Sequence, residues 1–396
     1  VWVAPGNGAT RWPAGAGRAA CQAVPLEVGD VEGLVDLARA GADLTVVGPE
    51  APLEAGLADS LRQAGLRVFA PGRAAARLET SKAFARDFMR RLGIPGPHYG
   101  VFEEYHQALA FARNLGGQVA VKADGLAGGK GVVVCSSLEE ADLALRRFLL
   151  EGQLGRAGRR VVLEERLEGL ELSALAFCDG KTVRPLPWAR DYKRAGEDDT
   201  GPNTGGMGAV APVEGPQSLL ERVLEPAVRG MAELGEPYVG FLYAGLMLTA
   251  EGPRVLEFNA RLGDPEAQVL LPLLEGDLYA ILESAVEGRL EQVRPLFRGC
   301  AATVVMASAG YPGPCASGHP IQGIEEAASL PDTLVFQAGT RSGQGGLETS
   351  GGRVLAVTGL GPSLDQALDR AYRGVACIRF EGAFYRRDIG RKRVRV

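Results

Sequence analysis

The stretch VKADGLAGGKGV occupies residues 121–132, and it indicates a strand, a glycine-rich loop and a second strand. The mainly apolar stretches VAVK at 119–122 and VVVC at 132–135 predict the two strands, and the loop spans residues 124–131. Consecutive main-chain N–H groups in such a loop form a concave site for an anion. Lys122 and Lys130 flank the glycines and would add positive charge. We therefore predict a phosphate-binding loop, the alternative being a hairpin whose glycines serve only the turn.

This loop differs from the nucleotide-binding loop in which Gly stands six residues before the Lys and Ser or Thr follows it. Asp124 and Gly131 occupy those two places here. The loop also joins two strands, whereas that motif joins a strand to a helix. The sequence therefore predicts a phosphate site of another kind.

Upstream, residues 1–76 alternate between short apolar strands and helices with apolar spacing. This order predicts a doubly wound parallel sheet, whose ligands bind beyond the carboxyl ends of the strands. Those ends are the loops at residues 4–8 and 47–50, the second of which includes Pro49 and Glu50. Neither loop has the G-x-G-x-x-G pattern of dinucleotide-binding proteins. Since the chain begins without Met, we expect the first strand and its loop to be missing.

The composition is that of a globular protein of two or three domains. The chain has 396 residues, 55 of them Gly, and a net charge of −5, which argues against nucleic acid as the main partner. No apolar run approaches the roughly 18 residues of a membrane span, and no signal peptide is visible. The six cysteines are far apart and the three histidines lack metal spacing. We expect free thiols, a cytoplasmic protein and no zinc site.

An acidic cluster begins at the end of a later predicted strand, residues 161–165, where residues 164–171 read EERLEGLE. A strand edge at residues 163–167 would present main-chain groups to an adenine ring, and Glu171 would accept hydrogen bonds from the ribose hydroxyls. A run of glutamates is more often a solvated surface. The nucleotide interpretation therefore depends on the glycine-rich loop upstream.

A polar segment extends from Arg190 to Gly208 and includes TGPNTGGMG at residues 200–208. It is too polar and too rich in glycine to form a core, and long loops are uncommon unless they are functional. Its main-chain N–H groups could bind a carboxylate or a phosphate, with Lys193 and Arg194 adding positive charge. The alternative is an ordinary surface loop.

The sequence VLEFNARLGDPE at residues 255–266 places Glu257, Asn259 and Arg261 on one face of a predicted strand. Carboxylate and amide oxygens suit Mg²⁺, which proteins hold with one or two carboxylates plus nucleotide phosphates. Arg261 could reach a transferring phosphoryl group. Inward polar side chains among apolar residues would be costly without ligands, and a solvated strand face is the alternative.

Taken in order, Lys82, Lys122, the glycine-rich loop, residues 164–167 and residues 257–259 resemble the ATP-grasp superfamily of carboxylate–amine ligases. Further stretches narrow the resemblance to the phosphoribosylamine–glycine ligase family: residues 47–53, 199–208, 240–245 and 261–266, and in the C-terminal part residues 351–355 and 387–390.

The resemblance implies an α/β and α+β multidomain fold in three parts. It implies an N-terminal doubly wound parallel-sheet domain at residues 1–78 and a central ATP-grasp domain at residues 79–296. A mobile lid would span about residues 98–165 of the central domain. A small C-terminal α/β domain would follow at residues 297–396.

The implied reaction belongs to purine biosynthesis: ATP, glycine and 5-phosphoribosylamine give glycinamide ribonucleotide, ADP and phosphate through glycyl phosphate. The implied metal is Mg²⁺ or Mn²⁺. The implied partners are these small molecules and, transiently, neighbouring enzymes of the pathway, with no nucleic acid and no membrane. The chain would be a monomer or a weak dimer.

The family's site residues carry over onto matching positions. The implied ATP site comprises Lys82, Lys122, Gly128, Gly129, Lys130, Glu164, Glu165, Leu167, Glu171 and Leu256. Glu257 and Asn259 would hold the metal, and Arg261 and Lys193 would be catalytic. The implied substrate site comprises Pro49, Glu50, Asp191, Asn203, Thr204, Gly205, Gly206, Gly263, Asp264, Pro265 and Glu266.

Two features depart from the family pattern. Many ATP-grasp enzymes carry a second carboxylate on the strand before the Glu-x-Asn sequence, but residues 242–247 contain no acid. The family's N-terminal glycine-rich loop is absent from this sequence. Two alternatives stay open, namely an ATP-grasp ligase for another acid or amine, and a nucleotide-binding sensor without turnover.

Overall fold

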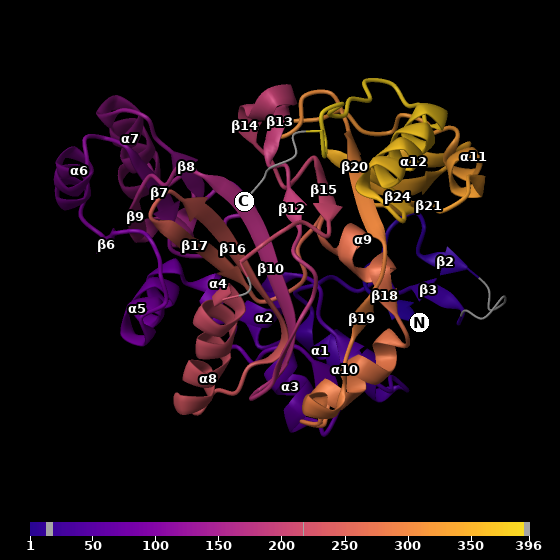
Figure 1. Ribbon diagram of the computed structural model, residues 1–396, viewed down its shortest axis with the longest axis horizontal. Helices are drawn as coiled ribbons and strands as arrows, with labels where there is room; N and C mark the ends of the chain where they lie inside the picture. The colour runs from indigo at the N-terminus through magenta and orange to yellow at the C-terminus, as the bar shows by residue number, and fades with distance from the viewer. Residues whose placement is uncertain (13–18, 217, 392–396) are drawn as a thin grey trace.

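Short strands alternate with helices in the N-terminal segment (Figure 1). The computed structural model describes residues 1–12, 19–216 and 218–391. Strand β1 pairs in parallel with β3, and β4 pairs in parallel with β5, in two separate small sheets. Strand β2 adds an antiparallel partner to β3. The elements are β1 (Trp2–Val3), β2 (Arg11–Trp12), β3 (Cys21–Ala23), α1 (Val31–Arg39), β4 (Thr45–Val46), α2 (Glu50–Ala55), α3 (Leu57–Gln63) and β5 (Val68–Phe69).

Two helices, α4 (Arg77–Thr80) and α5 (Lys82–Leu92), lead from this segment into the centre of the molecule. The Ser81 hydroxyl caps α5 by accepting a hydrogen bond from the Phe84 N–H at 3.2 Å, as the sequence predicts. Gly93 ends the helix with a φ of +67°, a conformation that glycine adopts without strain.

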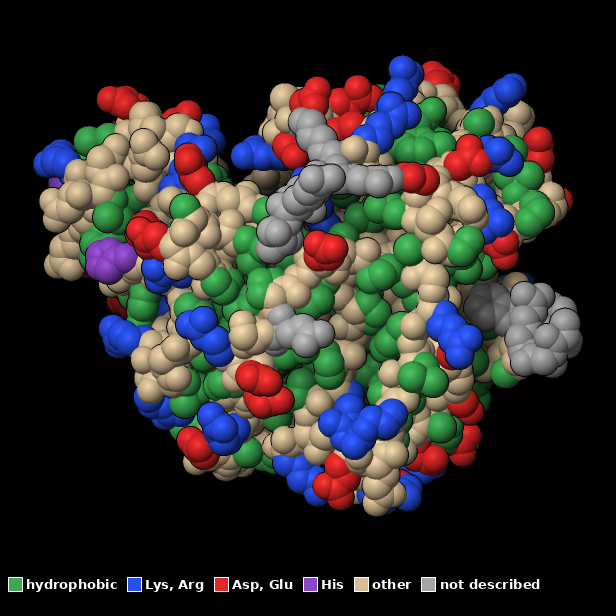
Figure 2. All heavy atoms as spheres, viewed as in Figure 1, with side chains coloured by type: hydrophobic (Ala, Val, Ile, Leu, Met, Phe, Trp, Pro, Cys, Tyr) green, Lys and Arg blue, Asp and Glu red, His purple; other side chains and the backbone are tan. Residues whose placement is uncertain are grey.

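A four-stranded antiparallel sheet in the order β6-β9-β7-β8 forms a lobe that projects from the body of the molecule (Figure 1). Helices α6 and α7 cover it, and the lobe has its own hydrophobic cluster around Val121 and Leu163. A notch separates this β6–β9 lobe from the region of β13 and β14 (Figure 2). Its elements are β6 (Tyr99–Phe102), α6 (Tyr105–Asn114), β7 (Val119–Ala123), β8 (Val132–Val134), α7 (Leu138–Leu145), η1 (Arg146–Leu150), η2 (Gly155–Arg159) and β9 (Val161–Glu165).

The central sheet is also antiparallel, in the order β11-β10-β16-β17. Its β17 side chains Val255 and Phe258 share one hydrophobic cluster with Leu53 and Leu61 of the N-terminal helices and with α8. The N-terminal segment is therefore packed firmly against the sheet that carries the Glu-x-Asn sequence. The elements are β10 (Leu170–Asp179), β11 (Val183–Pro185), η4 (Leu220–Leu224), α8 (Glu225–Glu233), β16 (Val239–Thr249), β17 (Gly252–Asn259), α9 (Ala267–Leu270), η5 (Leu271–Leu273), β18 (Leu274–Glu275), α10 (Leu278–Val286), η6 (Leu290–Gln292) and β19 (Leu296–Phe297).

A five-stranded sheet in the order β12-β15-β20-β24-β21 organises the C-terminal lobe, residues 300–390. Strands β12 (Arg190–Asp191) and β15 (Gly208–Ala211) come from the polar segment, so one sheet joins that segment to the C-terminal lobe. Between them lie β13 (Arg194–Gly196), η3 (Glu197–Asp199) and β14 (Thr200–Asn203). The other elements are β20 (Cys300–Ala307), α11 (Ile324–Ser329), β21 (Thr333–Gln337), β22 (Thr340–Gly343), β23 (Gly346–Thr349), β24 (Arg353–Gly361) and α12 (Leu364–Cys377).

All six cysteines are free thiols, as the sequence predicts. Among the residues that the structure describes, none of the helices combines the length and the apolar character that a membrane crossing requires.

Candidate active site

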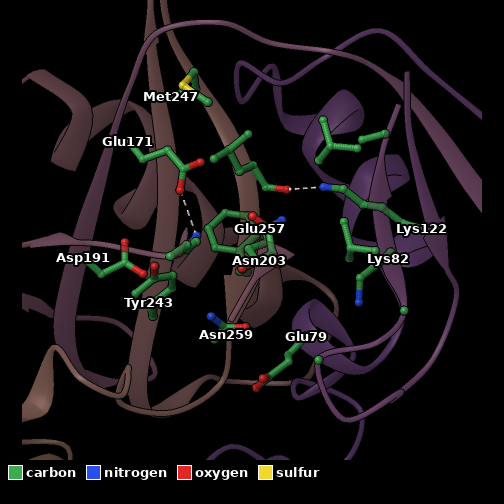
Figure 3. Close-up of a pocket in the computed structure, with 18 of the residues that line it drawn as sticks. Glu79, Lys82, Lys122, Glu171, Asp191, Asn203, Tyr243, Met247, Glu257 and Asn259 are labelled. Carbon is green, nitrogen blue, oxygen red and sulfur yellow. Dashed lines mark hydrogen bonds and ion pairs between the residues drawn. The ribbon is translucent and has the colours of Figure 1, made fainter. Parts of the chain in front are cut away.

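A cleft of about 690 Å³ opens between the β6–β9 lobe and the central sheet. Helices α4 and α5 contribute Glu79 and Lys82 to its lining, and strand β17 contributes Glu257 and Asn259 (Figure 3). A second hollow of about 550 Å³ shares Gly128, Gly129 and Arg261 with the cleft and is therefore continuous with it. The cleft brings together residues as far apart in the sequence as Glu50 and Glu266.

The glycine-rich loop connects β7 to β8, as predicted, and is fixed at its first residue. The Asp124 carboxylate accepts hydrogen bonds from the Ser81 hydroxyl at 3.0 Å, the Ala83 N–H at 3.0 Å and Arg160 Nε at 2.6 Å. Gly128 and Gly129 are exposed and have φ values of +54° and +77°. A Cβ at either position would meet nothing within 4 Å, so the backbone conformation, not the available space, requires glycine there.

Lys122 reaches across the cleft from the lobe to the central sheet. Its Nζ, at the right of the view in Figure 3, donates a hydrogen bond to the main-chain oxygen of Leu256 at 3.0 Å. The same Nζ pairs with Glu164 Oε2 at 2.8 Å. Arg86 of α5 completes the group, because its Nε pairs with Glu164 Oε1 at 2.6 Å and its Nη atoms donate to the oxygens of Val255 and Leu256. Burial would raise the pKa of Glu164, but Lys122 and Arg86 outweigh it and lower that pKa.

The expectation of a strand edge at residues 163–167 is wrong for most of that range. Strand β9 pairs with β6 on one side and with β7 on the other up to Glu164 and Glu165, so its main chain is engaged there. The Arg166 N–H still donates to the Gln118 oxygen at 3.1 Å. A flat apolar ligand would instead meet apolar parts of the lining, which include Met89, Ala120, Val134, Leu167, Met247 and Leu256.

Strand β17 carries Glu257 and Asn259 opposite Gly245 and Tyr243 of β16, so no acid faces them across the strand pair. Burial would raise the pKa of Glu257, but Lys193, Lys122 and other cations around it lower that pKa instead. Within the described part of the chain, no group of three or more His, Cys, Asp or Glu side chains could hold a metal ion. Any metal here would depend on Glu257, the Asn259 amide and ligands that a substrate brings.

Glu79 of α4 is a further carboxylate at this end of the cleft, and the sequence analysis did not identify it (Figure 3). It is 7% exposed and accepts a hydrogen bond from the Ala260 N–H at 2.7 Å. The Asn259 amide is best satisfied with its nitrogen donating to Glu79 Oε1 at 3.1 Å and to the Phe258 oxygen at 3.2 Å. Burial raises the pKa of Glu79 to about 7, and Arg261 opposes this effect.

Arg261 lies just beyond β17 and lines both hollows. Its Nε pairs with Glu50 at 2.9 Å and its Nη2 pairs with Glu79 at 3.1 Å. The strand ends at Asn259, so Arg261 reaches the cleft from a turn instead of from the predicted strand face. Two carboxylates from the N-terminal half of the chain therefore fix the position of this guanidinium.

Acidic side chains surround Lys193 on the opposite wall. Its Nζ pairs with Glu171 Oε2 at 3.1 Å (Figure 3), and Glu171 and Asp191 outweigh burial to raise the pKa of Lys193 well above its usual value. Burial raises the pKa of Asp191 to about 8, although Lys193 opposes the shift. Glu266 is buried nearby and accepts a hydrogen bond from the Ser173 hydroxyl at 2.8 Å.

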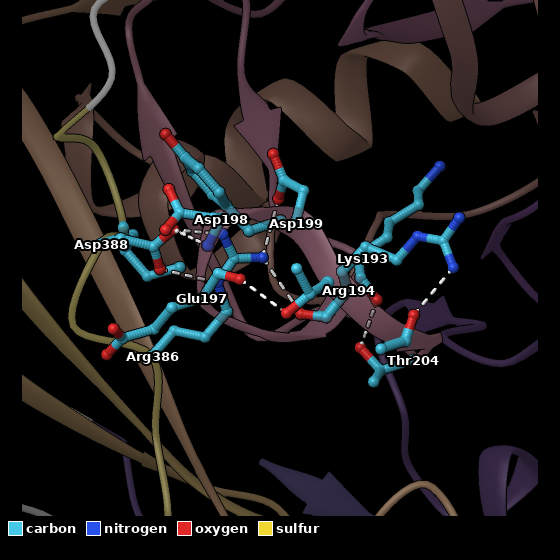
Figure 4. A network of polar contacts seen from close by, with 12 residues as sticks. Lys193, Arg194, Glu197, Asp198, Asp199, Thr204, Arg386 and Asp388 are labelled. Carbon is cyan, nitrogen blue, oxygen red and sulfur yellow. Dashed lines mark hydrogen bonds and ion pairs between the residues drawn. The ribbon is translucent and has the colours of Figure 1, made fainter.

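The polar segment folds into the β13–β14 hairpin and then returns to the cleft (Figure 4). Thr204 donates to the Lys193 oxygen from its N–H at 2.7 Å and from its hydroxyl at 2.8 Å. Gly206 packs against Pro265 so closely that a Cβ there would collide with the proline ring. These contacts place Asn203, Thr204 and Gly205 on the wall beside Lys193.

The structure brings the predicted site residues together, with two exceptions. Pro49 and Lys130 line the second hollow, and most of the others line the cleft. Gly206 and Pro265 line neither hollow within the described residues, and they support the wall from behind. The sequence analysis missed Glu79, Arg86 and Tyr243, which line the cleft, and Tyr311 and Arg353, which line the second hollow. The apolar spacing of helix 81–92 could have flagged Arg86 as a charge on a buried face. Tyr243 and Arg353 lie in the family-like stretches at residues 240–245 and 351–355, which gave them no individual role, and nothing local marks Glu79 or Tyr311.

Comparisons with known proteins agree with this architecture. Residues 1–79 match the N domain of phosphoribosylglycinamide synthetase, residues 80–267 match its ATP-grasp (A) domain, and residues 301–392 match its C domain. A crystal structure of phosphoribosylamine–glycine ligase from Thermotoga maritima superposes with a TM-score of 0.83 at 34% identity, covering 93% of this chain and 90% of that one.

Two curated relatives extend over nearly the whole chain. The phosphoribosylamine–glycine ligase of Allochromatium vinosum is 48% identical over 100% of this chain and 92% of its own length. The protein of that name from Pseudomonas aeruginosa is 47% identical over 98% of this chain and 91% of its own length. The three-part match, the shared fold and this level of identity lead to one conclusion: the chain belongs to the phosphoribosylglycinamide synthetase family of ATP-grasp ligases.

Proposed function

We propose that the chain is a phosphoribosylamine–glycine ligase, which joins glycine to 5-phosphoribosylamine with ATP and releases glycinamide ribonucleotide, ADP and phosphate. The observation that carries the proposal is the contact of Lys122 with the Leu256 oxygen at 3.0 Å. It places the end of the β6–β9 lobe directly beside Glu257, so a phosphate chain between them would meet cations on one wall and metal-binding oxygens on the other. The names of the two curated relatives support the choice of substrates.

The ATP site proposed here runs along the cleft. The adenine would lie on the apolar lining near Leu167 and Leu256, with the ribose hydroxyls at Glu171. Lys82, Lys122 and Lys130 would neutralise the phosphates, and the exposed N–H groups around Gly128 and Gly129 would bind their oxygens. Glu164 and Glu165 line the ATP site at the end of β9. Glu164 would contribute chiefly by holding the Lys122 ammonium in place.

A divalent metal ion, Mg²⁺ or Mn²⁺, would be held by Glu257 and Asn259. The donor set fits, because Glu257 keeps its charge among four cations and Glu79 engages the Asn259 nitrogen, which leaves the amide oxygen for a ligand. When bound, the metal neutralises charge on the phosphates. The two protein ligands are fewer than Mg²⁺ needs, so substrate oxygens and water would complete its coordination.

In the first step, a carboxylate oxygen of glycine attacks the γ-phosphorus of ATP, giving glycyl phosphate and ADP. Arg261 would stabilise the negative charge on the transferring phosphoryl group, because its guanidinium is already oriented by Glu50 and Glu79. Lys193 would place the glycine carboxylate for in-line attack. In the second step, the amine of phosphoribosylamine attacks the carbonyl carbon, and phosphate leaves with the electrons of the C–O bond.

The substrate site would lie between Lys193 and the second hollow. Asp191 would bind the glycine ammonium, and the segment at residues 203–206 would bound the glycine site beside Lys193. The N–H groups of Thr204, Gly205 and Gly206 already donate within the protein, so the predicted main-chain carboxylate site is not formed by them, and Lys193 would meet the carboxylate instead. Phosphoribosylamine would occupy the second hollow beside Pro49 and Glu50, bounded by residues 263–266.

We further propose that domains span residues 1–78, 79–296 and 297–396, with a lid at about 98–165. The sheet that joins β12 and β15 to β20 then crosses the second boundary. The cytoplasm is the proposed compartment, since all six thiols are free. The proposed partners are the small-molecule substrates and, transiently, neighbouring pathway enzymes.

The test is a phosphate-release assay with purified chain, ATP and Mg²⁺. Release is expected only when glycine and phosphoribosylamine are both present, and replacing glycine with alanine should abolish it. Equal turnover with another amino acid or amine would favour the rival ATP-grasp ligase. Nucleotide binding without turnover under any pairing would favour a sensor.

A further inference from the structure

Two motifs of the C-terminal lobe, at residues 351–355 and 387–390, have no role in the mechanism proposed above, although Arg353 lines the second hollow. The structure places both against the same part of the molecule. The polar segment at residues 194–205 forms one wall of the cleft, and Arg353 contacts it at Gly205. The segment around Asp388 contacts it at Asp198 (Figure 4).

Arg386, directly before the second motif, makes the strongest of these contacts. Its side chain is 1% exposed, so its charge must be satisfied within the protein. Nε and Nη2 bond the Asp388 carboxylate at 2.8 and 2.7 Å, and Nη1 bonds Asp199 Oδ1 at 2.9 Å and the Arg194 main-chain oxygen at 3.1 Å. One guanidinium therefore joins the C-terminal lobe to the first residue of β13 and to Asp199, which directly precedes β14 (Figure 4).

Neighbouring groups repeat this connection. The Asp198 N–H donates to Asp388 Oδ2 at 2.9 Å, and the Arg387 N–H donates to Glu197 Oε1 at 3.2 Å. Asp198 and Asp199 both have a φ of +56°, a backbone conformation that residues with side chains rarely adopt. A turn of this kind persists when surrounding contacts hold it.

A second connection lies at the other end of the segment. Arg353 Nη1 donates to the Gly205 oxygen at 2.7 Å, and its Nη2 pairs with Asp264 at 3.0 Å. The Gly205 N–H donates to the Tyr311 hydroxyl oxygen at 2.9 Å. The C-terminal lobe therefore holds the segment at Asp199 and at Gly205, on either side of residues 200–204. Thr204, which lies between these two contacts, donates a hydrogen bond to the Lys193 oxygen.

We propose that Arg386 is a positioning residue for the amino-acid substrate: it holds the β13–β14 hairpin so that Lys193 and residues 203–205 face the cleft in a fixed arrangement. The inference rests on the proposed function, since it takes this wall as the glycine site. A bidentate and multiply bonded guanidinium suits the task, because its rigid fork fixes several acceptors at once. The nucleotide end of the cleft, around Leu167 and Met247, has no contact with Arg386.

The experiment compares Arg386→Met, Arg386→Lys and a matched control, Arg370→Met. Arg370 also pairs with an aspartate in the C-terminal lobe, Asp332 at 3.0 Å, but it has no bond to the hairpin. We expect Arg386→Met to raise the KM for glycine by about 10- to 100-fold, because small displacements of positioning groups have effects of this size. The affinity for a non-hydrolysable ATP analogue should change less than about threefold. Arg386→Lys should show a smaller rise in the KM for glycine. Its ammonium retains the positive charge but cannot bond Asp388, Asp199 and the Arg194 oxygen with the planar geometry of a guanidinium.

Hydrogen exchange of residues 194–205 provides a readout that needs no activity. Faster exchange in Arg386→Met than in the wild type, with Arg370→Met unchanged, supports the proposal together with the KM effect. If Arg386→Met does not fold, Asp388→Asn is the second variant, since it weakens the same connection and retains the buried arginine; it should shift KM and exchange in the same directions.

Two results would overturn the proposal. In one, the wild type turns over normally and the glycine KM of Arg386→Met rises no more than that of Arg370→Met. In the other, exchange at residues 194–205 is the same in all variants. Failure of the proposed function would look different, because the wild type itself would then release no phosphate with both substrates.

Discussion

Individual side chains in the cleft act in pairs whose members come from distant parts of the sequence. Arg261 illustrates this, because its guanidinium pairs with Glu50 at 2.9 Å and with Glu79 at 3.1 Å and still lines both hollows. A guanidinium held in this way needs little reorganisation when charge develops on a phosphoryl group.

Replacing Arg261 with Ala should therefore affect the chemical step most. We expect kcat to fall by a factor that corresponds to about 2 kcal/mol or more of transition-state stabilisation. The dissociation constant of an ATP analogue, measured by calorimetry, should stay near the wild-type value. Arg261→Lys serves as the partial control, and an unchanged kcat in Arg261→Ala would contradict the role.

Glu79 is a buried carboxylate beside Asn259, whereas strand β16 has no acid facing that residue. It bonds the Ala260 N–H and faces the Asn259 amide nitrogen, so it orients a predicted metal ligand without being one itself. Replacing a residue that orients a metal ligand commonly weakens metal affinity by about 10- to 100-fold.

In Glu79→Gln, a rise of that size is expected in the Mg²⁺ concentration that gives half-maximal phosphate release. Glu50→Gln is the matched control, since Glu50 shares the Arg261 contact but has no bond to Asn259. The control should alter kcat and leave the metal requirement unchanged. Identical metal titrations for wild type and Glu79→Gln would remove Glu79 from this role.

At the scale of elements, α5 connects the β6–β9 lobe to the central sheet. Arg86 on this helix bonds Glu164 of the lobe and the Val255 and Leu256 oxygens of β17. Because Arg86 and Glu164 are both almost fully buried, removing one charge leaves the other poorly compensated.

Arg86→Met should lower the free energy of unfolding by about 3 kcal/mol, the lower end of the range for a broken buried pair, since Lys122 still faces Glu164. The measurement is the midpoint of urea unfolding. Arg90→Met on the same helix is the control, because Arg90 is exposed and its pair with Asp87 contributes at most about 1 kcal/mol. Equal midpoints for the two variants would refute the bridging role.

The β6–β9 lobe has its own core and projects beside the cleft, which is the arrangement expected of a lid (Figure 1). Hydrogen exchange of residues 125–131 should slow when Mg²⁺ and an ATP analogue are added, since the exposed N–H groups there would then bind phosphate. Helix α12 is the internal control and should exchange at the same rate throughout. Unchanged exchange at residues 125–131 would contradict the loop's assignment.

Across the whole molecule, the sequence predicted best what local pattern determines. The Ser81 cap, the hairpin around Gly128 and the shared face of Glu257 and Asn259 depend on spacing within a few residues, and the structure has all three. The three-part fold followed from the family resemblance and agrees with the domain matches.

Contacts between distant residues were not predictable in this way. Glu79 meets Ala260 across 181 positions, and Arg386 meets Asp199 across 187. The engagement of β9 on both sides, which makes the expected edge wrong, likewise depends on β6 and β7 folding against it. Such contacts arise from packing of whole elements, and no spacing in the sequence encodes them.

The central claim is that the β6–β9 lobe and strand β17 bind the triphosphate of ATP between them. A crystal structure with Mg²⁺ and a non-hydrolysable ATP analogue tests it most directly. The phosphates should lie between residues 124–131 and the pair Glu257 and Asn259, with the adenine beside Leu167. A nucleotide bound away from this cleft, or one whose phosphates point away from Glu257, would contradict the claim.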